Sequence, residues 1–482
     1  MINNFQFWNV FLPTLVLFSL VSCKIPKKKT EGELLAERLC SGCHLTPKPS
    51  EVNKGTWNLL LPDMLSRMPM NSVTKEEQDK LYQYYIEQAP YQLPIDKKRP
   101  TAKIDTSLFK SKVFDLKGHA AATTFVKIDE KLNTLYFADA AKRSVFNMSY
   151  EGNKIDSFVV PGGIMDFKKY GNGYRFLSMG NFMPTDEAKS TYGHIPVKKD
   201  SIGEPRILVS DLKRATDVQI ADLNGDNNDD FIISCFGLNF GGLSWYENVD
   251  TEPIEHKLNE YAGNIRTVVH DYNKDGLPDI YALVAQGDEK ILRYENKGNG
   301  NFEEHTLLRF PPSYGSTYFN LTDINKDGIL DILYVNGDNG DYTPIAKNYH
   351  GIRFYEGDEQ GAYEELLFLP INGPFKAIVK DFDKDHDLDI AAIAYFPDYK
   401  NRPQEGFVFF ENIGRLEFRR TTVPETYMGK WMVMDAGDID DDGDDDIVIG
   451  SALFMTQEAP PEMKSIWRTK SVPLLVLENQ TY

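Results

Sequence analysis

The strongest constraint on the fold is an acidic nine-residue segment that occurs five times. The copies begin at Asp222, Asp271, Asp323, Asp381 and Asp438, so their starts lie 49, 52, 58 and 57 residues apart. Each copy lies between two runs of β-forming residues, and a third apolar run follows it. A period near 50 residues, with no helical stretch between the strands, predicts a mostly β fold made of propeller blades. A β-helix would need shorter coils.

The number of blades follows from the space before the first copy. The five clear units begin near residue 217, and residues 100–216 leave room for two more at the same period. Two segments there, Phe125–Asp129 and Gly163–Ser178, resemble blades without the acidic loop. We therefore expect a seven-bladed β-propeller, closed by a strand around Val113–Phe114 that pairs with the last blade.

Each acidic segment has the spacing of a cation-binding loop. Oxygen-bearing side chains stand at positions 1, 3, 5 and 9, and position 6 is glycine except for Asn227 and His386. Hard carboxylate and amide oxygens in this arrangement favour Ca²⁺, as in an EF-hand loop, although strands flank the segment here. An acidic turn that binds no metal is the alternative. The predicted calcium ligands are Asp222, Asn224, Asp226, Asp230, Asp271, Asn273, Asp275, Asp279, Asp323, Asn325, Asp327, Asp331, Asp381, Asp383, Asp385, Asp389, Asp438, Asp440, Asp442 and Asp446.

The charge of the chain agrees with this assignment. Asp and Glu outnumber Lys and Arg by 72 to 53, which gives a net charge of −19. The ligand positions of the five loops contribute 17 carboxylates, so the predicted cation sites would account for most of the excess. A chain this acidic is not expected to bind nucleic acid, which requires a basic surface.

A second motif, C-x-x-C-H, lies near the N-terminus at Cys40, Cys43 and His44. This spacing is typical of covalent haem c attachment, with both thiols forming thioethers and the histidine binding the iron. A redox dithiol or part of a zinc site is the alternative, but no second Cys/His cluster completes a zinc site. Cys235 lies in an apolar run and is expected to be a buried core residue.

The residues around the motif predict a small helical domain. Apolar positions indicate a helix from Glu33 to Cys43, and a capping box at Thr74 opens another. A methionine between the two helices would bind the iron opposite the histidine, and Met64, Met68 and Met70 are the candidates.

The first residues indicate export. Val10–Leu20 is apolar and too short to span a membrane comfortably, and Leu20–Cys23 resembles a bacterial lipobox. Cys23 is then the lipidated first residue of the mature protein, although residues 1–9 lack the usual Lys or Arg. An ordinary signal peptide is the alternative. We expect a signal peptide at 1–22, a tether at 23–30, a cytochrome c domain at 31–95 and a propeller at 96–482. The lipid on Cys23 would anchor the mature protein in the cell envelope, on the periplasmic or the surface side of an outer membrane.

The acidic loops resemble the FG-GAP/VCBS repeats of integrin-type seven-bladed propellers, which bind calcium. The whole chain resembles bacterial lipoproteins that join a small cytochrome c to such a propeller, through Cys40–His44, Trp57, Asn336–Tyr342, Asn348–Gly351, Phe375–Ala377, Phe396–Tyr399 and Trp431–Ser451. Within this resemblance Met64 is the favoured iron ligand, because Leu61–Met64 follows Trp57 as in that family.

Three functions are compatible with this organisation. The favoured one is a membrane-tethered electron carrier whose propeller docks a redox partner protein or a small electron donor. The second is an oxidoreductase in which the propeller holds the substrate and the haem is the electron exit. The third is an adhesion or carbohydrate-binding module. No catalytic constellation is visible in the sequence, and the long segment 337–351, with Asp338, Asp341, Tyr342, Tyr349 and His350, is the one insertion that could carry activity.

Overall fold

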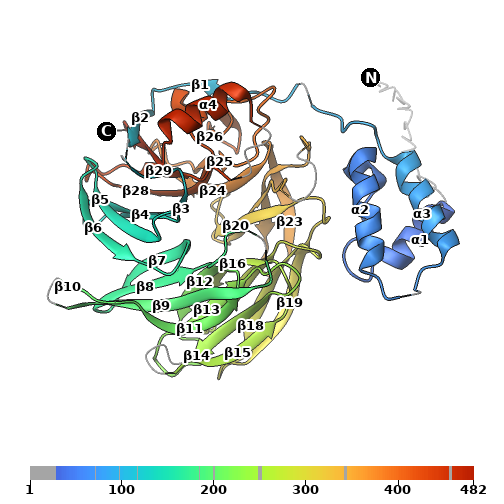
Figure 1. The fold of residues 1–482 in the computed structure, drawn as a ribbon, viewed down its shortest axis with the longest axis horizontal. Helices are drawn as coiled ribbons and strands as arrows, with labels where there is room; N and C mark the ends of the chain where they lie inside the picture. Colours follow the sequence, from blue (N-terminus) through green and yellow to red (C-terminus); the bar gives the residue numbers. More distant parts are fainter. Residues whose placement is uncertain are drawn as a thin grey trace, which may run out of the picture.

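The computed structural model describes residues 29–481 except 71, 97, 115, 117, 184, 199–200, 248–251, 341–344 and 455–458. Figure 1 shows a ring of β-sheets with three helices beside it. Seven separate sheets make up the ring, which confirms the mostly β fold and the seven blades. The signal peptide and Cys23 lie outside the described residues. Within the described part of the chain, no helix is long and apolar enough to cross a membrane.

Blades 1 and 2 occupy the region where degenerate units were expected, and they lack the acidic loop. In blade 2, strand β9 pairs with β11 as well as with β8 and β10. Their strands are β3 (Thr123–Asp129), β4 (Thr134–Asp139), β5 (Ser144–Ser149), β6 (Lys154–Val159), β7 (Ile164–Tyr170), β8 (Gly173–Ser178), β9 (Ala188–Lys198), β10 (Ser201–Ile202) and β11 (Arg206–Lys213).

Blades 3 to 6 are four-stranded antiparallel meanders, and each places its acidic segment between its first and second strands. The strands are β12 (Ala215–Ala221), β13 (Asp230–Cys235), β14 (Gly242–Glu247), β15 (Ile254–Asn259), β16 (Asn264–His270), β17 (Asp279–Val284), β18 (Lys290–Asn296), β19 (Phe302–Arg309), β20 (Ser316–Thr322), β21 (Asp331–Asn336), β22 (Gly351–Gly357), β23 (Tyr363–Pro370), β24 (Pro374–Lys380), β25 (Asp389–Ala394), β26 (Phe407–Asn412) and β27 (Phe418–Thr422).

Blade 7 closes the ring with strands from both ends of the propeller. It contains β28 (Trp431–Gly437), β29 (Asp446–Ser451), β30 (Leu474–Asn479) and β2 (Phe109–Phe114). Antiparallel pairing of β2 with β30 confirms the predicted closing strand. A 3₁₀ turn at Pro424–Met428 and helix α4 (Pro461–Lys470) decorate the blades, and the Trp467 indole donates to the Tyr427 carbonyl (2.9 Å).

The core lies between the blades. The second strands of blades 4 to 7 are buried along their whole length, which explains runs such as Ile280–Val284 that are apolar on both faces. Around the central channel, polar side chains tie one blade to the next. Asp217 of blade 3 accepts hydrogen bonds from the backbone and hydroxyl of Thr267 in blade 4 (2.9 and 2.7 Å). These links fix the first strands of adjacent blades in register.

The N-terminal helices form a unit with its own core. They are α1 (Glu31–Cys40), α2 (Lys54–Ser66) and α3 (Lys75–Gln88), with a 3₁₀ turn at Pro49–Glu51. The predicted capping box at Thr74 is present. The first helix ends at Cys40 rather than at Cys43, because Ser41 and Gly42 are weak helix formers and the Cys43 amide closes a turn onto the Cys40 carbonyl (3.3 Å). Trp57 and Tyr85 stack at the centre of this core (4.2 Å between centroids).

The linker between the two parts is fastened to blade 6. Strand β1 (Lys103–Ile104) pairs in parallel with β27 and extends this blade to five strands. Just before it, Arg99 forms a buried ion pair with Glu405 and a hydrogen bond to the Asn372 side chain (3.1 Å). Burial lowers the pKa of Arg99 and raises that of Glu405, so each charge depends on its partner.

We expect Arg99→Ala to lower the free energy of unfolding by about 3 kcal/mol, because it removes the closest counter-ion of the buried Glu405 carboxylate and leaves only the longer pair with Arg402 (3.8 Å) among its ion pairs. Thermal and urea unfolding measure this loss. Lys75→Ala is the matched control, since its pair with Asp79 is exposed (side chains 81% and 64%) and contributes less than about 1 kcal/mol. Equal unfolding midpoints for the two variants would contradict the assignment.

Candidate functional site

The C-x-x-C-H motif forms a turn at the C-terminal end of α1. The Cys40 and Cys43 thiols are both free; Cys40 is half-buried and Cys43 is exposed. Burial raises the pKa of the Cys40 thiol, and a hydrogen bond with Tyr85 opposes this effect. Two free thiols at the surface of a helical core are available to form two thioethers.

His44 is oriented by the backbone. Its Nδ1 lies 2.8 Å from the Leu45 carbonyl oxygen. A carbonyl oxygen only accepts hydrogen bonds, so Nδ1 carries the proton and Nε2 keeps its lone pair. Metal-binding histidines are commonly fixed in this way. The donor set therefore fits haem c: two thiols for the porphyrin and one pre-oriented imidazole for the iron.

The loop after the motif is held by the two central aromatic residues. The Tyr85 hydroxyl donates to the Pro47 carbonyl (3.0 Å), and the Trp57 indole donates to the Pro49 carbonyl (2.9 Å). Since both donors are buried in the helical core, residues 45–50 cannot move freely relative to His44. Leu39 and Leu60 pack only partly against this core, which leaves apolar surface available to a flat hydrophobic ring.

The three candidate methionines differ in their positions. Met64 is half-buried in the last turn of α2, two residues after Pro62. Met68 follows the end of that helix and is also half-buried, whereas Met70 is 91% exposed. Met64 and Met68 are thus the two half-buried candidates for the iron ligand.

We expect Met64→Ala to abolish the weak methionine-to-iron charge-transfer absorption of the ferric protein, because this band requires a thioether on the iron. Met68→Ala and Met70→Ala are the matched controls and should keep it. The absorption spectrum at near-infrared wavelengths checks this result. Loss of the band only in Met68→Ala or Met70→Ala would transfer the ligand role to that residue.

The five acidic loops share one backbone framework. The carboxylate at position 1 accepts the amide of position 6: Asp271 binds Gly276 N (2.8 Å) and Asp381 binds His386 N (3.1 Å). Asn227 and His386 adopt the same left-handed conformation (φ 64° and 74°) as the glycines that occupy position 6 elsewhere. The two loops that lack the glycine therefore form the same turn as the others.

The aspartates at position 9 have a structural role that the spacing did not reveal. All five are fully buried: Asp230, Asp279, Asp331, Asp389 and Asp446. In Asp331, one oxygen accepts the Ile324 amide (3.0 Å) and the other accepts the Gly357 amide (3.0 Å). The carboxylates of Asp279, Asp331, Asp389 and Asp446 each join the acidic loop to the end of the third strand of the blade in this way.

Blades 6 and 7 bring carboxylates closest together. Single ligand atoms of Asp381, Asp383 and Asp385 lie within 4.8 Å of one another, and so do those of Asp438, Asp440 and Asp446. The other three loops have asparagine at position 3, and in two of them its amide nitrogen faces the neighbouring aspartate, as in Asn325 to Asp327 (3.0 Å).

Asp444 is the clearest sign of a cation. It is 2% exposed, and neither of its carboxylate oxygens has a hydrogen-bond donor. One oxygen each of Asp381 and Asp440 is also buried without a donor. Burial and the neighbouring Asp442 raise the pKa of Asp444 to about 7, and burial raises that of Asp446 to about 7. Carboxylate oxygens that are buried without a donor are ligands that fit a hard divalent ion.

Sequence reasoning missed Asp444 because position 7 of such a loop ordinarily offers only its backbone carbonyl.

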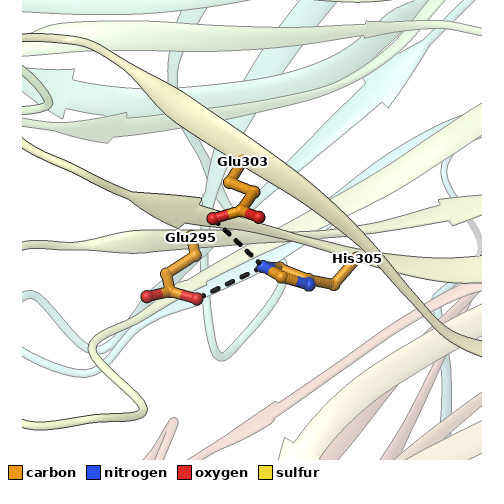
Figure 2. Close-up of side chains that lie close together, drawn as sticks. All are labelled: Glu295, Glu303 and His305. Carbon is orange, nitrogen blue, oxygen red and sulfur yellow. Dashed lines mark ion pairs between the residues drawn. The ribbon is translucent and has the colours of Figure 1, made fainter.

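It also missed the group Glu295, Glu303 and His305 on blade 4 (Figure 2). There the His305 Nε2 lies 3.2 Å from Glu295 and 4.0 Å from Glu303. The Lys297 ammonium already contacts both carboxylates (2.5 and 3.2 Å), so this group is a cross-strand ion-pair cluster.

The cation loops and the helical unit lie at opposite ends of the blades. In blade 5 the acidic loop joins β20 to β21, whereas the segment that contacts the helices joins β21 to β22. The Tyr349 hydroxyl in that second segment donates to the Glu51 carbonyl (2.8 Å). Changes at the acidic loops therefore have no direct route to the C-x-x-C-H motif.

Comparisons with known proteins support the propeller part. Residues 271–334, which include two acidic loops, match the FG-GAP-like repeat family. The chain is thus a seven-bladed β-propeller with FG-GAP-like repeats and three additional N-terminal helices. No functionally curated protein matches the sequence.

Solved structures with related shapes are distant. A streptogramin B lyase has 13% identity and a TM-score of 0.46, over 77% of this chain and 98% of that one. Virginiamycin B lyase from Staphylococcus aureus has 10% identity and a TM-score of 0.46, over 77% and 98%. BBS1N in complex with ARL6DN has 9% identity and a TM-score of 0.46, over 77% and 96%. These values support no conclusion about activity.

Proposed function

We propose that the protein is a membrane-tethered electron carrier in which residues 31–95 form a cytochrome c domain. Cys40 and Cys43 hold haem c through thioethers, and His44 and a methionine, Met64 in our assignment, bind its iron. The observation that carries this proposal is the orientation of the His44 imidazole. Its Nδ1 donates a hydrogen bond to the Leu45 carbonyl, and the two free thiols precede it in the same motif. When bound, haem c supplies reversible one-electron storage.

The propeller supplies a rigid, calcium-stabilised surface that docks a redox partner protein or a small electron donor. Support comes from the unpaired carboxylate oxygens of blades 6 and 7, which a divalent cation would neutralise. Long loops at the opposite end of the blades lie beside the helices and are the natural place for a partner to approach.

A propeller-hosted oxidoreductase is the second candidate, and one observation favours it. Tyr349 and Asn348, at the end of the long segment 337–351, contact the helical unit and its linker directly. Next to them His350 is fully buried, and its Nε2 has no hydrogen-bond partner. A substrate bound at this segment would lie close to the haem, so electrons could leave by that path.

A redox titration of the purified full-length protein tests the electron-carrier proposal. We expect one reversible one-electron transition in the visible spectrum and fast reduction by a small chemical donor. Absence of a reversible transition in protein that contains haem would refute it. Reduction by a particular alcohol or sugar, lost in His350→Ala but kept in His256→Ala, would favour the oxidoreductase.

We expect the mature protein to begin at Cys23 and to carry lipid there, because Leu20–Cys23 resembles a lipobox. Cys23→Ala should leave the precursor unprocessed and non-acylated, while Cys235→Ala should have no effect on processing. Mass spectrometry of the N-terminal peptide checks both. A free Cys23 thiol in the mature wild-type protein would contradict the lipid anchor.

A further inference from the structure

The helical unit is held close to the propeller by a short linker. The Lys54 amide binds the Pro90 carbonyl (2.9 Å), which fixes residue 90 to the helices. The Asp96 amide binds the Asn348 side chain (3.1 Å), and Arg99 is anchored on blade 6. Only residues 91–95 span the gap, and five residues reach at most about 18 Å. Such a tether gives the two parts a high effective concentration for each other, so a few contacts suffice to dock them.

Two contacts dock the histidine side of the helical unit, and both involve Glu51. The Ser313 hydroxyl donates to Glu51 Oε2 (2.8 Å), and the Tyr349 hydroxyl donates to the Glu51 carbonyl (2.8 Å). Ser313 lies in the turn between β19 and β20, and Tyr349 lies just before β22. At the end of α2, Arg67 donates to the Asn239 side chain (3.3 Å). The propeller therefore touches the helical unit at two places, the 3₁₀ turn that contains Glu51 and the end of α2.

Glu51 places a negative charge near the iron ligand. Burial at the interface raises the pKa of Glu51, and the hydrogen bond from Ser313 opposes this rise. Lys48 lies close enough for its charge to act on the Glu51 carboxylate in the same direction as Ser313, and the His44 ring lies near the same carboxylate. A carboxylate that is shielded from water interacts more strongly with neighbouring charge than an exposed one does.

We propose that Glu51, held by Ser313 and Tyr349 of the propeller, lowers the reduction potential of the haem. This inference rests on the proposed cytochrome c function. A negative charge on the histidine side stabilises the ferric state, which carries one more positive charge than the ferrous state. Glu51 is not among the residues that would hold the haem, and it would act on the iron through its charge alone. Through it, propeller docking sets how readily the haem gives up its electron.

The test is the reduction potential of the haem-loaded full chain. Glu51→Gln should raise it, with about a tenfold change in the ferrous-to-ferric ratio at a fixed ambient potential, which equals about 59 mV for one electron. Ser313→Ala should shift it in the same direction by less, and Glu51→Asp should restore most of the wild-type value. Glu76→Gln is the matched control, because it removes the same charge from an exposed position of α3 (78% exposed) and should leave the potential unchanged.

A second measurement reports docking without the haem. The Asp96 amide bonds the Asn348 side chain across the two parts, so hydrogen exchange of this amide follows how often they separate. The double variant Ser313→Ala, Tyr349→Phe should exchange it faster than the wild type, with or without haem. Equal potentials for Glu51→Gln and Glu76→Gln in fully haem-loaded protein would overturn the inference. Failure to attach haem at all would instead overturn the proposed function.

Discussion

Replacing Cys40 and Cys43 with alanine should remove all covalent haem and leave the propeller folded. Each thioether needs its own thiol, so the double variant cannot retain the group through denaturation. The helices have a hydrophobic core of their own around Trp57 and Tyr85, separate from the cores between the blades. Haem-stained denaturing gels measure attachment, and thermal unfolding of the β signal measures the propeller.

Cys235→Ala is the matched control for this experiment. That residue lies at the end of β13 in blade 3, where burial raises the pKa of its thiol to about 12 and makes it unreactive. The control should keep the wild-type haem content. Covalent haem in the Cys40, Cys43 double variant, or its loss in Cys235→Ala, would contradict the assignment of the motif.

Removal of calcium should be the largest perturbation of the propeller. A ligand that binds only the folded state adds about 2.7 kcal/mol per site at a hundredfold excess over Kd, so the two loops with converging carboxylates contribute more than about 5 kcal/mol together. EDTA should therefore lower the thermal midpoint of the β transition. The haem spectrum should not change, because the acidic loops lie at the opposite end of the blades.

The variant Asp440→Asn should distinguish a metal site from a structural turn. Asp440 has a buried oxygen without a donor, and burial and Asp442 raise its pKa. In calcium the variant should lose one bound ion and unfold at a lower temperature than the wild type. In EDTA the order should reverse, because the neutral amide removes repulsion among Asp438, Asp440 and Asp442.

Asp441→Asn is the control for that reversal. It removes the same charge from an exposed position of the same loop, and asparagine tolerates its left-handed backbone (φ 66°). It should retain the full calcium content. Identical unfolding of the wild type with calcium and with EDTA, together with no calcium by elemental analysis, would identify the loops as structural turns.

The local patterns of the sequence were sufficient to predict the blades. Each acidic loop lies between two strands as expected. The turn residues and the apolar runs on either side of them form a local signal that extends over fewer than 20 residues. The closing strand was also predictable, since Val113–Phe114 is an apolar run that precedes the first blade and needs a partner. The left-handed turns at Asn227 and His386 follow from the same loop framework.

Contacts between distant segments could not be predicted in this way. The parallel pairing of β1 with blade 6 and the buried pair of Arg99 with Glu405 join residues about 300 positions apart. Burial of Asp444 and the docking of Glu51 on Ser313 depend on how neighbouring blades and loops pack. No periodicity marks such residues, so the buried carboxylate of Asp444 and the contact of Glu51 with the propeller became visible only in three dimensions.

The most direct test of the cytochrome assignment is the pyridine haemochrome spectrum of the full-length protein, expressed with a haem-attachment system and then extracted with acidified acetone. We expect a c-type spectrum, about one haem per chain, and no haem in the organic phase. Haem that extracts completely, or a purified protein that contains none, would contradict the central claim.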